Sequence, residues 1–164
     1  MILQIPVLFF ALVIDRVCGD PKTSLHPVAL IGRFIGWWGV PERYPAWMQR
    51  MVGIVGWIIT VVLFTLPFVL FQIAAPWYVY LVIGPFLLKI CFAWRALEEH
   101  AQAVARAISD EERSKQASLL VSRDTSVLSE EQTLSAAFES VAENLNDSII
   151  APLFWFLILG LPGA

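Results

Sequence analysis

Charge is the property of which this chain has least. Only 15% of its 164 residues are Asp, Glu, Lys or Arg, whereas soluble domains carry about a quarter. Between Arg50 and Lys89 the only ionisable side chains are those of Tyr78 and Tyr80. That stretch is long enough for two bilayer crossings at about 20 residues each. An ordinary soluble domain is therefore excluded, and the composition predicts an integral membrane protein.

Several other signatures are missing. The two cysteines, Cys18 and Cys91, give neither a disulfide framework nor metal-ligand spacing. The patterns G-x-x-x-x-G-K-[ST] and G-x-G-x-x-G do not occur, so a nucleotide would need a different kind of site. No basic block interleaved with aromatic residues indicates a nucleic-acid partner. No Lys or Arg precedes the apolar residues 1–14, which we interpret as a retained membrane segment and not a secretory signal.

The distribution of apolar runs predicts a single all-α domain. We expect a polytopic helical membrane protein with about four membrane segments, namely residues 1–14, a transmembrane hairpin over 51–94, and residues 148–164. Residues 15–50 form a polar loop broken by prolines. Residues 95–147 hold most of the acids and form a helical region.

The basic residues predict which side of the membrane the polar regions face. Residues 15–50 and residues 95–147 each carry five Lys or Arg residues, whereas the turn at 72–76 carries none. Basic loops favour the cytoplasmic side. We therefore expect a multi-pass protein of the cell membrane whose two polar regions both face the cytoplasm, where they can meet.

Local signals place two helices in the second polar region. Ser109-x-x-Glu112 and Ser129-x-x-Gln132 have the form of capping boxes, so we expect helices to begin near residues 110 and 130. On the second helix the larger apolar residues recur at helical spacing and predict the buried stripe, which consists of Leu134, Phe138, Val141 and Leu145.

An acidic ladder lies on the same helix, roughly opposite that stripe. Glu139, Glu143 and Asp147 follow one another at four-residue spacing, which places them on nearly one face. Like charges so arranged repel, and no Lys or Arg occurs from Thr125 to the end of the chain. Two interpretations stay open: a solvated helix face, or a site in which these acids and Asn144 bind magnesium or a substrate ammonium.

The first polar region offers a second candidate cluster. Asp15 and Asp20 flank Gly19, and His26 follows a few residues later. Two carboxylates and an imidazole suit divalent-metal binding or general-base work. The alternative is a polar loop in which Asp20 caps a turn and His26 has no functional role.

Two further groups could contact an anionic substrate. In Arg123-Asp124-Thr125 the arginine could bind a phosphate through two hydrogen bonds while the aspartate orients it; an ordinary ion pair that closes a loop is the alternative. Lys89 lies inside an apolar run. Its amine either extends to the cytoplasmic interface or contacts an anionic substrate.

Taken together, these clusters resemble the CobD/CbiB family of membrane-bound cobalamin-biosynthesis proteins, the adenosylcobinamide-phosphate synthases. The resemblance extends over essentially the whole chain and rests on motifs in the family's order: Asp15-Arg16-x-x-Gly19-Asp20-Pro21, His26-Pro27-Val28, Ile31-Gly32, Leu97-Glu98-Glu99-His100-Ala101, Arg123-Asp124-Thr125, Glu139-Ser140-Val141-Ala142-Glu143-Asn144, Asp147 and Ala151-Pro152-Leu153-Phe154. Ser122 stands where the family usually has Gly. The family also continues past Ala164, so the chain is similar to its N-terminal half.

The resemblance implies an ATP-dependent ligase that forms an amide. A carboxylate of adenosylcobyric acid, a corrinoid, joins the amine of an aminoalcohol phosphate such as aminopropanol phosphate, with ATP and Mg²⁺ required. By chemistry we assign catalytic roles to the ladder, to Asn144 and to the first cluster, and tentative metal binding to the three ladder acids. Arg123, Asp124, Thr125 and Lys89 would bind substrate. Expected partners are membrane lipid and a second half of the same protein.

Two other functions compete with the ligase. A non-catalytic membrane sensor or assembly partner related to the family would have lost the polar motifs, yet those of this half are present. A small transporter would carry charges near the middle of its spans, whereas here they lie at the ends apart from Lys89.

Overall fold

The computed structural model describes residues 2–20, 27–121 and 128–164. Within these ranges all regular structure is helical, which confirms the all-α prediction. The elements are α1 (Gln4–Cys18), α2 (Pro27–Trp38), the 3₁₀ turn η2 (Pro41–Arg43), α3 (Ala46–Ala74), α4 (Trp77–Lys89), α5 (Trp94–Arg106), α6 (Asp110–Ala117), α7 (Glu130–Leu145), the π-helix η3 (Asn146–Ile150), α8 (Ala151–Leu159) and the 3₁₀ turn η4 (Leu161–Gly163).

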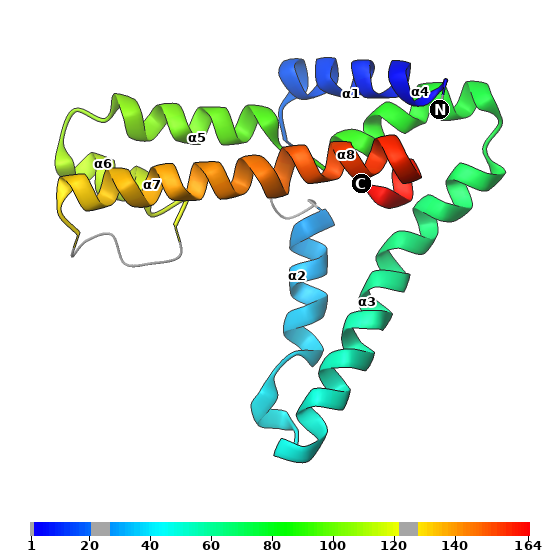
Figure 1. The fold of residues 1–164 in the computed structure, drawn as a ribbon, viewed down its shortest axis with the longest axis horizontal. Helices are drawn as coiled ribbons and strands as arrows, with labels where there is room; N and C mark the ends of the chain where they lie inside the picture. Colours follow the sequence, from blue (N-terminus) through cyan, green and yellow to red (C-terminus); the bar gives the residue numbers. More distant parts are fainter. Residues whose placement is uncertain (1, 21–26, 122–127) are drawn as a thin grey trace.

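Apart from α2 and α3, the helices form two groups that meet end to end (Figure 1). The apolar group consists of α1, α4 and α8, and the polar group consists of α5, α6 and α7. Helices α7, η3 and α8 follow one another as one long rod. Helices α1 and α4 lie beside its α8 end, and α5 and α6 lie beside its α7 end. In the apolar group, α1 packs along α4 and Gln4 Nε2 donates a 3.1 Å hydrogen bond to the carbonyl of Phe156 on α8. The shared core consists of Val7, Ala11, Tyr80, Leu88, Phe92, Phe156 and Leu161.

The polar group has a smaller core, made by Val104, Ala117 and Ala137. Both predicted helix starts in this group are confirmed. Helix α6 begins at Asp110, where the Ser109 hydroxyl accepts from the backbone N–H of Glu112, and α7 begins at Glu130 behind a complete capping box. These starts follow from local hydrogen bonding, because the capping side chains satisfy N–H groups that have no partner within the helix.

The buried stripe predicted for α7 is only partly right: Leu134 packs against the small core and Val141 is half-buried, but the other two residues are exposed. Phe138 is 73% exposed and Leu145 is 45% exposed. The face that α7 buries instead carries small side chains, and it consists of Thr133, Ala136, Ala137 and Ser140. Small residues let the neighbouring backbone approach closely, so here packing follows side-chain size and not hydrophobicity.

Two stretches are long and apolar enough to cross a membrane: Ala46–Ala74, which is α3, and Trp77–Arg106, in which α4 and α5 follow one another. Helix α3 continues through Pro67, and only 6% of its most apolar window is buried. Helices α1 and α8 have 15 and 9 residues, fewer than the roughly 20 that a crossing needs. The expected count of about four membrane segments therefore stays a prediction.

The hairpin expected over residues 51–94 is not a packed pair. Helix α4 packs along α1, while α3 leaves the turn at Ala75 and Pro76 at a wide angle (Figure 1). Both turn residues are extended, with ψ of 129° and 152°. The C-terminal end of α3 contacts η4 instead. There the Gln72 amide donates to the carbonyl of Leu159 (3.1 Å) and accepts from the N–H of Leu161 (2.9 Å).

The polar loop expected over residues 15–50 contains an apolar helix. Helix α2 runs toward the N-terminal end of α3, which the chain reaches through η2 (Figure 1). The rings of Phe34 and Phe64 lie 6.0 Å apart, so α2 packs against α3. The sequence predicted a loop here because the region contains several prolines and arginines, which are typical of polar connections.

Candidate functional site

A buried ion pair lies where the apolar and polar groups meet. Lys89 is the last residue of α4, and its Nζ lies 2.9 Å from Asp15 Oδ1 and also bonds the carboxylate of Asp20. Lys89 is 3% exposed and Asp15 2% exposed. Buried charges need close partners, and a cation is favoured at a helix C-terminus. Lys89 therefore does not extend to the exposed interface; two aspartates hold it inside the protein.

Asp15 has a second partner on the polar side. Its Oδ2 accepts a 3.0 Å hydrogen bond from the backbone N–H of Arg95 in the first turn of α5. First-turn N–H groups have no partner within their own helix, so this carboxylate caps α5 from a distant part of the chain. Asp15 thus joins α1, α4 and α5 at one point.

Exposed ion pairs and a hydrogen bond also join the end of α1 to the start of α5. Arg16 pairs with Glu98, and Arg95 pairs with Glu99 through Nε–Oε1 at 2.6 Å. Arg95 Nη1 also donates to the carbonyl of Val17 at 3.1 Å. The hydrogen bond and charge of Glu98 raise the pKa of Arg16 above its usual value. The prediction that the two polar regions meet is confirmed for these residues.

The acidic ladder lines a separate cavity of about 270 Å³ on α7 and η3. One wall carries the ladder acids Glu139, Glu143 and Asp147 together with Asn144 and Ser140. The other wall is the chain at Leu120 and Val121. The ladder therefore borders the buried face of α7 and does not lie opposite it, because the helix is rotated from the predicted orientation.

Ser140 and Asn144 fix the shape of this cavity. The Ser140 hydroxyl donates a 2.6 Å hydrogen bond to the Leu120 carbonyl and so ties the two walls together. Asn144 Nδ2 donates to the Ser140 carbonyl at 2.8 Å and to its hydroxyl at 3.2 Å. The sequence pattern does not predict this role of Ser140. The sequence feature that could have indicated this role is a hydroxyl on a helix face that otherwise carries alanines, four residues before Asn144.

The ladder ends in a π-helix. Pro152 has no N–H to give to the Ser148 carbonyl, which instead accepts a 3.2 Å bond from the backbone N–H of Ala93, between α4 and α5. Single π turns inside α-helices often occur at functional sites. This turn carries Asp147, the last member of the ladder, and the bond from Ala93 fixes it against the junction of the two helix groups.

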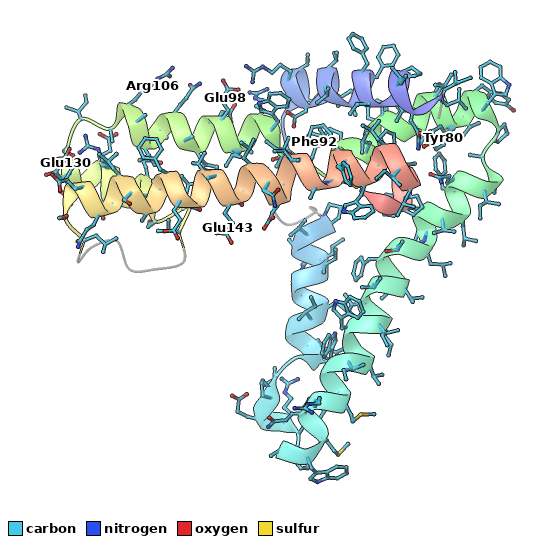
Figure 2. All side chains as sticks on the ribbon, viewed as in Figure 1. Tyr80, Phe92, Glu98, Arg106, Glu130 and Glu143 are labelled. Carbon is cyan, nitrogen blue, oxygen red and sulfur yellow. The ribbon has the colours of Figure 1, made fainter. Side chains whose placement is uncertain are left out.

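The structure therefore sorts the predicted site residues into two sets. Asp15, Asp20 and Lys89 form the buried ion pair, whereas Glu139, Glu143, Asn144 and Asp147 line the cavity. In Figure 2 Glu98, near the ion pair, and Glu143 point to opposite sides of the α5–α7 layer. The remaining predicted residues lie outside the described ranges: His26, Arg123, Asp124 and Thr125.

Comparison with known proteins agrees with these motifs. The family model described as CobD/Cbib protein matches residues 8–164. The chain belongs to the CobD/CbiB family.

Curated relatives in this family are named for cobalamin biosynthesis. The "Probable cobalamin biosynthesis protein CobD" of Thermococcus kodakarensis is 41% identical over 94% of this chain and 52% of its own length. The protein of the same name from Methanothermobacter thermautotrophicus is 37% identical over 98% and 53%, and the "Cobalamin biosynthesis protein CobD" of Dehalococcoides mccartyi is 37% identical over 96% and 53%. The chain thus spans about half the length of these relatives. No solved structure matches.

In the described part of this CobD/CbiB chain the ladder offers a partial set of metal ligands. Among the described residues no three His, Cys, Asp or Glu side chains are grouped closely enough to hold an ion. An all-protein cage is thus not preformed there. Magnesium, however, is commonly held by one or two carboxylates together with water and substrate phosphates. Neighbouring ladder carboxylates on the cavity wall offer that partial set of ligands.

Proposed function

We propose that this chain belongs to an amide-forming ligase of cobalamin biosynthesis, and that the carboxylate-lined cavity on α7 and η3 receives the amine substrate. The membership of the chain in the CobD/CbiB family supports the pathway. The observation that carries the proposal is the cavity itself, whose wall bears the carboxylates of Glu139, Glu143 and Asp147 beside the amide of Asn144. Such a wall attracts an ammonium group.

The acids of the cavity wall would act on the protons of the amine. An ammonium cannot attack a carbonyl carbon until its nitrogen has a free electron pair. ATP would supply the phosphoryl group that activates the corrinoid carboxylate, and magnesium would neutralise phosphate charge when bound. The C–N bond forms, the bond from that carbon to the phosphate oxygen breaks, and the two protons lost by the nitrogen go to Glu143 and to the solvent.

The other predicted residues take different parts in this proposal. Arg123 with Asp124 and Thr125 keeps its assignment as a phosphate-binding motif, made from the sequence alone. The proposal treats three residues as positioning residues: Asp15, Asp20 and Lys89. The two carboxylates pair with the Lys89 amine, and Asp15 also accepts a hydrogen bond from the first turn of α5. They hold the polar helices on the apolar ones, which would keep the cavity at the cytoplasmic face of a multi-pass protein.

Reconstitution tests the reaction. The full-length protein in membranes is incubated with adenosylcobyric acid, aminopropanol phosphate and ATP-magnesium, and the corrinoid products are analysed by mass spectrometry. We expect the amide, formed only when ATP is present. If a well-folded full-length protein forms no amide with this or related aminoalcohol phosphates, the ligase proposal is wrong, and the non-catalytic membrane partner becomes the better account.

A further inference from the structure

The π turn η3 joins two helix faces that an unbroken α-helix would point in different directions. Ser140 lies on the buried face of α7, and Phe156, which is 0% exposed, lies in the apolar core with Val7 and Ala11 of α1. An α-helix turns about 100° per residue, so Ser140 and Phe156 would lie roughly 160° apart. The extra residue of one π turn reduces this angle to roughly 60°. Both faces can then meet their neighbours α5 and α1, which lie on one side of the rod (Figure 1).

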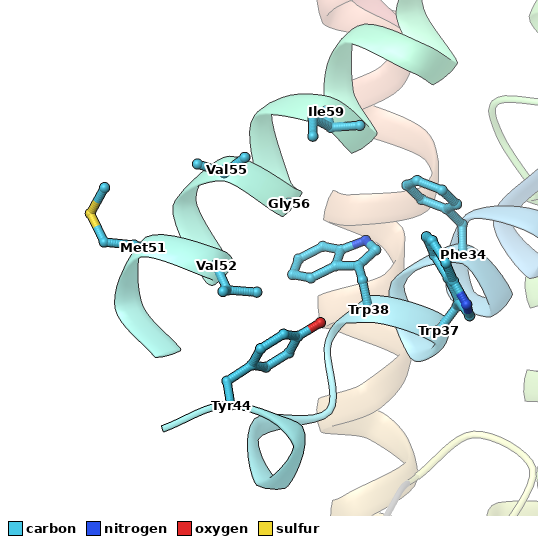
Figure 3. A pocket seen from close by; sticks show the side chains of 9 residues that line it. All are labelled: Phe34, Trp37, Trp38, Tyr44, Met51, Val52, Val55, Gly56 and Ile59. Carbon is cyan, nitrogen blue, oxygen red and sulfur yellow. The ribbon is translucent and has the colours of Figure 1, made fainter. Parts of the chain in front are cut away.

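A proline alone does not produce such a turn. Helix α3 continues as an α-helix through Pro67, and α4 does so through Pro85. Helix α3 makes its own contacts with α2, around an apolar cavity of about 400 Å³ beside Trp38 (Figure 3). A substitution at Pro67, which is exposed, can therefore serve as the control for one at Pro152.

What distinguishes Pro152 is a donor from another part of the chain. Pro152 has no N–H to bond the Ser148 carbonyl, and the N–H of Ala93 donates to that carbonyl instead, at 3.2 Å. The N–H of Ala151 bonds the carbonyl of Asn146, one residue further back than in an α-helix. The π turn therefore depends on Pro152 and on Ala93 together.

Ala93 is itself held in place from both sides. Phe92 before it is 2% exposed and belongs to the apolar core. Two residues after it, the N–H of Arg95 donates to the buried carboxylate of Asp15. The Ala93 donor therefore cannot follow the Ser148 carbonyl if the helix turns, and the bond between them fixes the π turn against the junction of the two helix groups.

Asp147 lies within the turn that is held in this way. It lines the acidic cavity, and its Oδ1 accepts a 2.8 Å hydrogen bond from Nδ2 of Asn146. The residue that follows it is Ser148, whose carbonyl Ala93 holds. We propose that Pro152, acting through the hydrogen bond between Ala93 and Ser148, positions Asp147 for the amine substrate. This role rests on the proposed function of the acidic cavity, which Pro152 itself does not line, so Pro152 is a positioning residue.

Carbon-13 NMR of the Asp147 carboxyl group tests this role without the reaction. Pro152→Ala supplies an N–H that competes with Ala93 for the Ser148 carbonyl. In full-length protein labelled at the aspartate Cγ, the Asp147 signal is assigned by its loss in Asp147→Asn. We expect this signal to shift or broaden in Pro152→Ala, with faster hydrogen exchange of the Ala93 amide, and both to stay unchanged in Pro67→Ala. Neither proline variant should unfold at a lower temperature, because an internal proline weakens a helix and each substitution removes one.

The kinetics of amide formation then test whether Pro152 acts through Asp147. Pro152→Ala should raise the KM for the aminoalcohol phosphate about tenfold, the effect of losing one hydrogen bond to a charged group. Pro67→Ala should keep the parent KM. In an Asp147→Asn background Pro152→Ala should cause no further rise, because the effects of two residues that act through one contact do not add.

Three outcomes would overturn the positioning role of Pro152. The first is an unchanged Asp147 signal in Pro152→Ala, and the second is an equal change of that signal in Pro67→Ala. The third is a rise in KM that persists in full in the Asp147→Asn background. If the parent protein forms no amide, the ligase function fails, while the Asp147 signal still decides whether Pro152 positions this carboxylate.

Discussion

Lys89 and Asp15 form an ion pair, Nζ to Oδ1 at 2.9 Å, at the place where the apolar helices α1 and α4 end and the polar helix α5 begins. Because Asp15 also caps α5, this one pair orders both helix groups. Lys89, for which the sequence predicts either an amine at the membrane interface or a substrate contact, is thus held inside the fold by this pair.

Removal of the cation at this junction is expected to destabilise the protein strongly. Lys89→Met leaves Asp15 buried without its partner, and breaking a buried pair in this way costs about 3–5 kcal/mol. Thermal unfolding of the protein in detergent measures the loss. Lys115→Met, at an exposed position on α6, is the control and should unfold at nearly the parent temperature. If both variants unfold alike, the pair does not anchor the fold.

The turn after α8 depends on a glycine. Gly160 has φ of +76°, and an added Cβ would collide with the amide of Gln72. Gly160→Ala should therefore disrupt the Gln72 hydrogen bonds and cost about 1–3 kcal/mol from backbone strain and lost bonding. Gly53→Ala on α3 meets no atom within 4 Å and serves as the control. Equal unfolding temperatures for the two variants would contradict the role of Gln72.

The hydroxyl of Ser140 is expected to shape the acidic cavity. Ser140→Ala removes its bond to the carbonyl of the half-buried Leu120, and the loss of one such bond costs about 0.5–1.5 kcal/mol. Amide formation should fall while the exposed control Ser135→Ala stays active. Ser140→Thr, which retains the hydroxyl, should recover part of the loss. Full activity in Ser140→Ala would show that the two walls do not need this link.

The sequence predicted those features that depend on neighbouring residues. Helix starts at Asp110 and Glu130 follow from capping side chains within the same four residues, and the apolar stretch of α3 follows from composition. Features set by distant contacts were missed. The rotation of α7 depends on how closely the chain at Leu120 approaches small residues such as Ala137, and this outweighs the hydrophobicity of Phe138.

In the candidate site, too, features set by neighbouring residues were predicted and features set by distant contacts were missed. Four-residue spacing was enough to place Glu139, Glu143 and Asp147 together, because helix geometry alone determines it. No local pattern could show that Lys89 pairs with Asp15 and Asp20, which are far away in the sequence. The cavity beside Trp38 was also missed, since it requires α2 to fold back on α3.

The central claim is that the ladder acids receive the amine substrate, and amide formation by Glu143→Gln tests it most directly. The substitution keeps the size of the side chain and removes its charge. Glu131→Gln, on the same helix but outside the cavity lining, is the control. We expect Glu143→Gln to lower kcat at least 100-fold, the effect typical of a lost general base, with the unfolding temperature unchanged and Glu131→Gln near parent activity. Near-parent turnover by Glu143→Gln would contradict the account and make the ladder a solvated helix face.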